Sequence, residues 1–141
     1  MDPVALLAFN GGLQVFASSL LGMFMLVPLQ PWGKGVATRV NMKSLLATHL
    51  DWLMLSFMQQ GAAFMMSRWP ETASPWTAWL LAFGGWTNVS PYLLRGFGIN
   101  AFVLGGSWGQ RAAAGIAVLS TAAILSAWSR LLLTMLSVLR R

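Results

Sequence analysis

The single histidine of the chain, His49, lies six residues into a long apolar stretch, and Asp51 follows it two positions later. An imidazole and a carboxylate are costly to keep inside an apolar segment of membrane-spanning length, so a functional role is the default interpretation for both. A lone histidine in such a segment can also serve as a hydrogen-bonding contact between helices. We therefore expect the chemistry of this protein to lie around His49, with helix packing as the alternative.

Residue types that bind metal ions are scarce in the sequence. The chain has no cysteine and one histidine, which excludes disulfides, thiolate-ligated haem, iron–sulfur clusters and zinc sites built on several Cys or His residues. Any metal would therefore have His49 as its one strong protein ligand. A porphyrin suits this arrangement because it supplies four nitrogen ligands itself and needs only one axial residue.

Helical spacing predicts which side chains share a face with His49. At about 100° per residue, Leu53 and Ser56 fall on its stripe, whereas Asp51 points about 200° away. Asp51 is therefore not expected to orient the His49 ring. Its expected partner is Arg95, whose long side chain can reach it and form a structural ion pair that lowers the cost of both charges.

A second polar stripe, Asn88 and Tyr92 followed by Arg95, occurs in a later apolar stretch, where Pro91 is expected to kink the helix. At about 1.5 Å rise per residue, His49 and Tyr92 lie at similar depths from the same side of a membrane, so they could line one cavity. We expect Asn88 and Tyr92 to orient a substrate oxygen in that cavity.

Long apolar stretches must position these residues. Apolar residues make up 57% of the 141 positions and charged residues 9%, and four stretches are long enough to cross a bilayer as helices. We place them at about residues 4–29, 44–67, 76–98 and 111–137, with short connectors between them. The predicted fold class is therefore all-α, a single domain over residues 1–141 that forms an integral, multi-pass bundle of four transmembrane helices.

The charged residues bear on topology and partners. Asp2 and no Lys or Arg precede the first apolar stretch, so the basic start of a cleaved signal peptide is missing and the first span is expected to be retained. The basic residues divide almost evenly between the two predicted sides, so the positive-inside rule selects no orientation. Basic ends that flank apolar spans are typical of contact with anionic lipid, and we expect the lipid bilayer as a partner and no nucleic acid.

Short motifs in a fixed order add a resemblance to a known family. Val27-Pro28-Leu29 ends the first predicted helix, His49-Leu50-Asp51 lies early in the second, and Gly85-Trp86-Thr87-Asn88 lies in the third. In motif order, span number and length, most of the chain resembles the family of styrene oxide isomerase and hydroxylaminobenzene mutase. Those are small four-helix membrane proteins with a His-Leu-Glu type motif and a Gly-Thr-Tyr-Ala-Asn type motif in the corresponding helices.

The resemblance implies a homotrimer with haem b between subunits, held by His49 as the axial ligand of the iron. It also implies an isomerase in which ferric haem acts as a Lewis acid on a small, apolar aromatic substrate. In one branch of the family an aryl epoxide rearranges to an aldehyde or ketone, and in the other an aryl hydroxylamine rearranges to an aminophenol. The implied location is a bacterial inner membrane.

The chain departs from the family pattern at positions that bear on the reaction. Leu55-Ser56 stands where the family has Asn-Gly, Trp86 where it has Tyr, and Asp51 where it has Glu. Asn88 is retained. Tyr92, one turn beyond Asn88 on the same face, is our candidate to replace the missing phenol, by its position and not by the family pattern.

Two other functions fit the same sequence. A non-catalytic haem-binding or electron-transfer membrane protein would also use one axial histidine, although an electron carrier usually has a second strong ligand. A small transporter or assembly subunit without a cofactor would use polar residues of the apolar stretches as its lining, namely Asn10, Gln14, Gln59 and Gln60.

Overall fold

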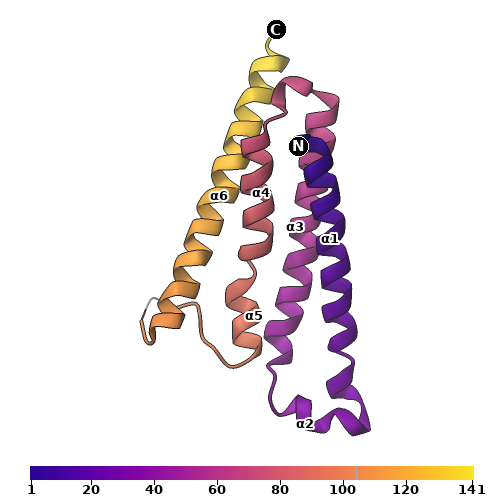
Figure 1. Cartoon of the computed structure of the whole chain (residues 1–141), viewed down its shortest axis with the longest axis vertical. Helices are drawn as coiled ribbons and strands as arrows, with labels where there is room; N and C mark the ends of the chain where they lie inside the picture. Colours follow the sequence, from indigo (N-terminus) through magenta and orange to yellow (C-terminus); the bar gives the residue numbers. More distant parts are fainter. Residues whose placement is uncertain (104) are drawn as a thin grey trace.

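The computed structural model describes residues 1–103 and 105–141, and helices make up most of this part of the chain. No strand occurs within the described residues, so the predicted all-α class is confirmed. The long helices α1, α3 and α6, and α4 followed by α5, run along the long axis of the molecule (Figure 1). The helices are α1 (Pro3–Phe24), η1 (Val27–Leu29), η2 (Pro31–Gly33), α2 (Lys34–Ala37), α3 (Met42–Arg68), η3 (Pro70–Thr72), α4 (Pro75–Thr87), α5 (Ser90–Gly96) and α6 (Trp108–Leu139).

These helices follow the predicted spans with two differences. The helix α1 ends at Phe24, and the last residues of that predicted span form the 3-10 helix η1. The third predicted span is divided into α4 and α5. Among the described residues, two helical stretches, Pro3–Leu29 and Trp108–Leu139, are long and apolar enough to cross a membrane, each with a mean hydropathy of 1.7.

Pro91 explains why the third span is divided. Proline has no N–H to offer the carbonyl group of Thr87, four residues earlier, and its ring crowds that carbonyl. Accordingly, α4 ends at Thr87 and α5 begins at Ser90, as the kink predicted from Pro91 requires. Asn88 caps the end of α4, and its backbone N–H donates to the carbonyl oxygen of Gly84 at 2.9 Å. The break therefore places Asn88 between two helices instead of inside one.

The helices pack as two pairs, α1 with α3 and α4 with α6, and η3 connects the pairs at the end of the molecule that carries both termini (Figure 1). Glycines allow close approach within each pair. A Cβ atom on Gly11 would lie 3.0 Å from the backbone oxygen of Ser56, and one on Gly84 would collide with Ile124. The buried apolar core lies towards the termini and comprises Leu7, Ala62, Ala63, Met66, Ala78, Leu81, Ala127 and Leu131.

A network of amide side chains joins α1 to α3 and α4. Asn10 Nδ2 donates to Gln59 Oε1 at 2.6 Å, and Gln59 Nε2 donates to Gln14 Oε1 at 2.6 Å. The indole N–H of Trp86 donates to Asn10 Oδ1 at 2.9 Å. Gln60 is separate and donates to a backbone carbonyl of α1 at 2.9 Å. Each of these four polar residues therefore bonds to another of them or to the backbone.

Replacing Gln59 by leucine should lower the free energy of unfolding by about 1–3 kcal/mol, because the buried Gln14 and the half-buried amide nitrogen of Asn10 would lose their partner. Gln60→Leu is the matched control, since it removes one bond at a less buried position and should cost less than about 1 kcal/mol. Thermal unfolding in detergent, followed by helical circular dichroism, measures both changes. Equal losses in the two variants would contradict a stabilising role for the buried network.

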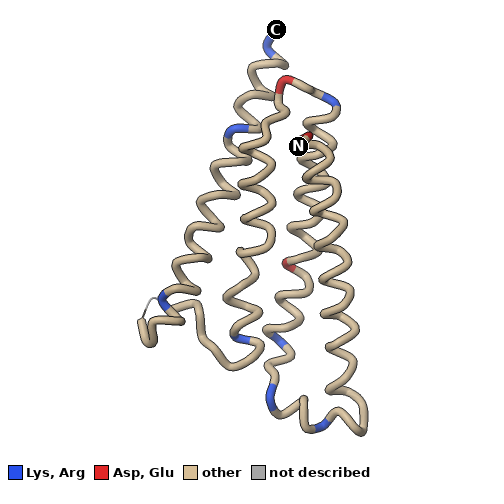
Figure 2. Tube along the Cα trace, in the orientation of Figure 1, with Lys and Arg blue, Asp and Glu red and all other residues tan. Residues whose placement is uncertain are grey.

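Apolar side chains cover the outer faces of the helices. Phe9, Phe16, Phe57 and Phe64 are each more than half exposed. The charged residues gather mostly near the two ends of the molecule (Figure 2), and Asp51 lies inside α3. An exposed apolar surface of this extent indicates contact with a membrane or with other protein chains.

Candidate functional site

His49 lies near the start of α3, and its ring is fixed by α1. The Nδ1 atom is 2.8 Å from the backbone oxygen of Ser18 and 2.9 Å from its hydroxyl, and that hydroxyl donates to the backbone oxygen of His49 at 2.7 Å. Because the serine proton is used in the last bond, Nδ1 must carry the ring proton and donate it to Ser18. The other ring nitrogen, Nε2, makes no hydrogen bond to residues 1–103 or 105–141 and is available to a ligand.

Gly22 lets α1 lie close to this ring. A Cβ atom at Gly22 would be 3.1 Å from Cε1 and 3.4 Å from Nδ1 of His49, which leaves little room for a larger residue. Leu46, one turn before His49 on α3, and Met23, beside Gly22 on α1, are exposed and apolar. His49 therefore has a fixed ring, one available nitrogen and apolar surroundings.

His49 and the polar residues of the third span lie on different sides of α3. Asp51, about 200° around the helix from His49, accepts a hydrogen bond from Asn88 Nδ2 at 3.4 Å. Asp51 thus faces the break between α4 and α5, whereas His49 faces α1. Within one chain, His49 does not share the cavity that Tyr92 lines, because similar depth along two helices does not place side chains on the same face.

Asn88 connects α4 to both α3 and α6. While its amide nitrogen donates to Asp51, its Oδ1 atom accepts bonds from the hydroxyls of Thr121 at 3.4 Å and Ser120 at 3.5 Å. These bonds are long, and both hydroxyls donate at shorter distances, 3.0 Å and 3.1 Å, to backbone oxygens. Asn88 is therefore held in place without using its full hydrogen-bonding capacity, so it can also bond to a ligand.

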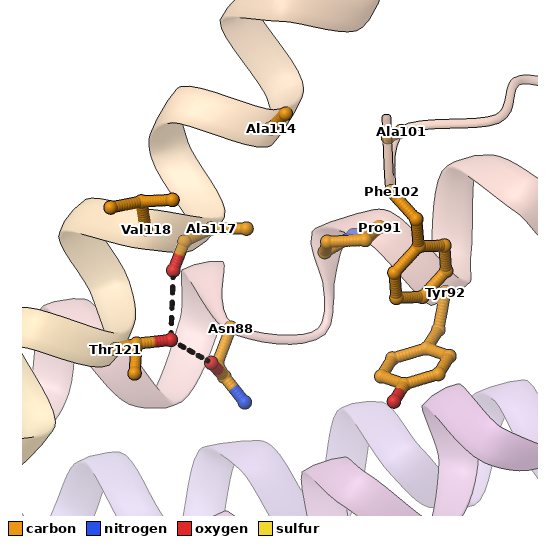
Figure 3. Close-up of a pocket in the computed structure, with 9 residues that line it drawn as sticks. All are labelled: Asn88, Pro91, Tyr92, Ala101, Phe102, Ala114, Ala117, Val118 and Thr121. Atoms are coloured by element: carbon orange, nitrogen blue, oxygen red, sulfur yellow. Dashed lines mark hydrogen bonds between the residues drawn. The ribbon is translucent and has the colours of Figure 1, made fainter. Parts of the chain in front are cut away.

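Asn88 and Tyr92 line a cavity of about 320 Å³ beside α5 and α6. Figure 3 shows the amide nitrogen of Asn88 and the hydroxyl of Tyr92 directed towards the same side. The Tyr92 and Phe102 rings meet edge to face with their centroids 4.8 Å apart, so one wall is aromatic. Pockets for small molecules begin at about 300 Å³, which suits a ligand with one aromatic ring. The residues that line the cavity are Asn88, Pro91, Tyr92, Ala101, Phe102, Ala114, Ala117, Val118 and Thr121.

The expected ion pair between Asp51 and Arg95 is not formed within the described residues. Asp51 bonds to the amide described above, and the guanidinium of Arg95 lies over the Phe102 ring, 5.7 Å from its centroid. The helix end that carries Arg95 packs beside Leu45, where a Cβ atom on Gly96 would collide with the leucine side chain. Asp51 lies six residues, or about 9 Å, further along α3. Arg95 is exposed and has an aromatic partner close by.

The positions that depart from the family pattern are used for helix packing. Ser56 is fully buried against Gly11, and its hydroxyl donates to a backbone oxygen of α3 at 2.7 Å. The indole of Trp86 bonds to α1, and its ring meets the Trp52 ring with the centroids 5.7 Å apart. Neither Ser56 nor Trp86 lines the cavity beside α5 and α6. Ser56 and Trp86 therefore contribute to contacts between helices.

Ser18 is a site residue that sequence reasoning missed. Gly11, Gln14, Ser18 and Gly22 recur every three or four residues in α1 and form a small and polar stripe towards α3. This stripe is visible in the sequence and identifies the face of α1 that meets another helix. It does not identify His49 as the residue opposite Ser18, because that pairing depends on how far the two helices are shifted along each other.

No group of three or more His, Cys, Asp or Glu side chains that could hold a metal ion occurs in the part of the chain that the structure describes. A scan against models of protein families finds no match, and a search of curated proteins finds no significant match either.

Proposed function

We propose that the protein is an integral membrane protein whose helices cross the bilayer four times, with α4 and α5 acting together as one span. At about 1.5 Å per residue, α3 is about 40 Å long and the segment from Pro75 to Gly96 about 33 Å, and both lengths exceed the ~30 Å of bilayer hydrocarbon. The exposed phenylalanines and the charges near the two ends of the molecule support this arrangement.

The proposed cofactor is haem b, with His49 as the axial ligand. One observation carries this proposal: Ser18 holds the proton on Nδ1, which leaves Nε2 available to bind iron. A histidine that binds a metal through one ring nitrogen usually donates a hydrogen bond from the other. That bond fixes the tautomer and the orientation of the ring. The apolar side chains of Leu46 and Met23 suit the faces of a porphyrin.

The proposed activity is that of an isomerase acting on an aryl epoxide or an aryl hydroxylamine. Bound haem would supply a Lewis-acidic iron for the oxygen of either substrate. In this proposal, Asn88 and Tyr92 orient the substrate oxygen through hydrogen bonds, and Phe102 contacts its aromatic ring. The apolar side chains of Ala114 and Ala117 line the cavity, and an apolar lining within the bilayer would favour rearrangement over hydrolysis.

A homotrimer would reconcile the positions of these groups. His49 faces α1, whereas the Asn88 cavity lies on another side of α3. A neighbouring copy of the chain could bring its own cavity to the open side of His49, so that one site is built from two subunits. The protein in detergent should therefore have the mass of three chains, as measured by light scattering with correction for bound detergent. A stable monomer that retains haem would contradict the shared site.

The visible spectrum and the turnover of the wild-type protein test the proposed function together. The protein, purified in detergent after expression with sufficient haem, should show a Soret band and convert styrene oxide or phenylhydroxylamine without added reductant. Product chromatography identifies the rearranged compounds. A colourless protein would overturn the haem proposal. A haem-loaded protein that is inert towards both substrates would instead favour the non-catalytic haem-binding or electron-transfer function.

A further inference from the structure

Two arginines from distant parts of the chain line one polar cavity. Arg39 lies in the connector before α3, and Arg95 lies in the last turn of α5. Both side chains are exposed at the surface of the protein, and the cavity that they share has a volume of about 450 Å³. It is lined by Thr38, Arg39, Val40, Asn41, Arg95, Gly98 and Asn100.

Backbone contacts hold the two arginine-bearing segments together. The backbone N–H of Asn41 donates to the carbonyl oxygen of Gly96 at 2.8 Å, which joins the start of α3 to the end of α5. Gly98 adopts a φ of +88°. Its backbone N–H donates to the carbonyl oxygen of Arg95, and the backbone N–H of Ile99 donates to the carbonyl oxygen of Leu94. This is the Schellman arrangement that ends a helix at a glycine. The cavity is therefore built on fixed backbone.

The carboxylates of the chain are all used elsewhere. The sequence has three acidic residues, Asp2, Asp51 and Glu71. Asp2 caps α1, Glu71 lies in η3 towards the opposite end of the molecule, and Asp51 bonds to Asn88. Two guanidinium groups are thus held around one cavity that no carboxylate lines. Like charges at such a position repel each other unless an anion binds between them.

We propose that this cavity binds the phosphate group of an anionic phospholipid. The planar guanidinium matches phosphate oxygens with two parallel hydrogen bonds, and the side-chain amide of Asn100 adds a neutral donor. The lipid assignment rests on the proposed membrane location and does not depend on haem. Arg95 lies in the last turn of α5 and Arg39 in the connector before α3, where headgroups would be, and the exposed Phe97 and Ile99 beside the cavity suit an acyl chain.

Native mass spectrometry of the detergent-purified protein tests the proposal with three probes: dioleoylphosphatidylglycerol, dioleoylphosphatidylcholine and inorganic phosphate. The wild type should prefer phosphatidylglycerol over phosphatidylcholine. Arg39→Gln and Arg95→Gln should each weaken phosphatidylglycerol binding by about tenfold or more, since each removes charge-assisted bonds to the phosphate. Lys34→Gln is the matched control, because it removes one charge near the same end of the molecule but outside the cavity.

The controls separate a built site from general attraction. Arg39→Lys keeps the charge but loses the planar guanidinium that donates two parallel hydrogen bonds. Its affinity for phosphatidylglycerol should therefore lie between those of the wild type and Arg39→Gln. An equal loss in Lys34→Gln would overturn the proposal, as would unchanged binding in both glutamine variants. Binding of inorganic phosphate alone, lost in both variants, would overturn the lipid assignment while leaving a phosphate site. Circular dichroism and the Soret band of each variant show whether its fold and its haem content have changed.

Discussion

Replacing His49 by alanine is expected to remove most of the Soret absorbance of the purified protein while leaving its helical circular dichroism unchanged. His49 is the chain's one strong ligand for iron. Removing a residue that only hydrogen-bonds to a metal ligand already lowers metal affinity by about 10- to 100-fold. Removing the ligand itself should weaken haem binding more. We therefore expect haem affinity to fall by more than about 100-fold. Haem titration of the variant, followed at the Soret band, measures the change.

Asp51→Asn is the matched control for this experiment. Asp51 lies two residues from His49 in the same helix, but it faces Asn88 and not α1. Its replacement should leave the haem content unchanged, although a second ionisable group has been removed from the same segment. A His49→Ala protein that keeps its Soret band would show that another group holds the iron, and the proposed role of the Ser18 contact would fall with it.

Asn88→Ala and Tyr92→Phe are expected to slow the rearrangement by about 30- to 1000-fold each without loss of haem. This range corresponds to about 2–4 kcal/mol of transition-state stabilisation, the usual cost of removing one hydrogen bond to a developing charge in a dry site. Both side chains line the same cavity and are directed to one side of it (Figure 3). Turnover of styrene oxide and phenylhydroxylamine, measured by product chromatography, gives the two rates.

Thr121→Val provides a graded comparison in the same cavity. Its hydroxyl makes only a long bond of 3.4 Å to Asn88 and a closer one to its own helix. The isosteric change should therefore slow the reaction by less than about tenfold, through Asn88 alone. Full activity in both Asn88→Ala and Tyr92→Phe would remove these residues from the reaction, whatever the result for Thr121.

The helical class and the position of the break could be predicted from local properties of the sequence. Apolar stretches of sufficient length indicated the long helices, and Pro91 indicated the interruption because proline lacks an N–H and crowds the preceding turn. The stripe of Asn88 and Tyr92 survived the break, since both residues line one cavity. These features depend on residues close together in the chain, so neighbouring residues were enough to predict them.

The contacts between helices could not be predicted in the same way. The expected partner of Asp51 was Arg95, but the position of α5 after the break sets that arginine nearer to Phe102. Similar depth along their helices suggested that His49 and Tyr92 meet. Whether two such side chains face each other depends on how packing rotates each helix about its own axis, and the sequence pattern does not determine that rotation. Ser18 was missed for this reason. Its role follows from the shift of α1 along α3, which glycines such as Gly22 determine.

The break between α4 and α5 also places Asn88 between the two helix pairs. On one side of it, the hydroxyl of Ser120 ties α4 to α6 through the carbonyl of Gly84, at 3.1 Å. On the other side, the bond from Asn41 to Gly96 ties α5 to α3. A change in the angle between the two helix pairs would therefore widen or narrow the cavity without unwinding either helix. Substrate size would then be selected by the tilt of one helix pair against the other more than by the bulk of any single side chain.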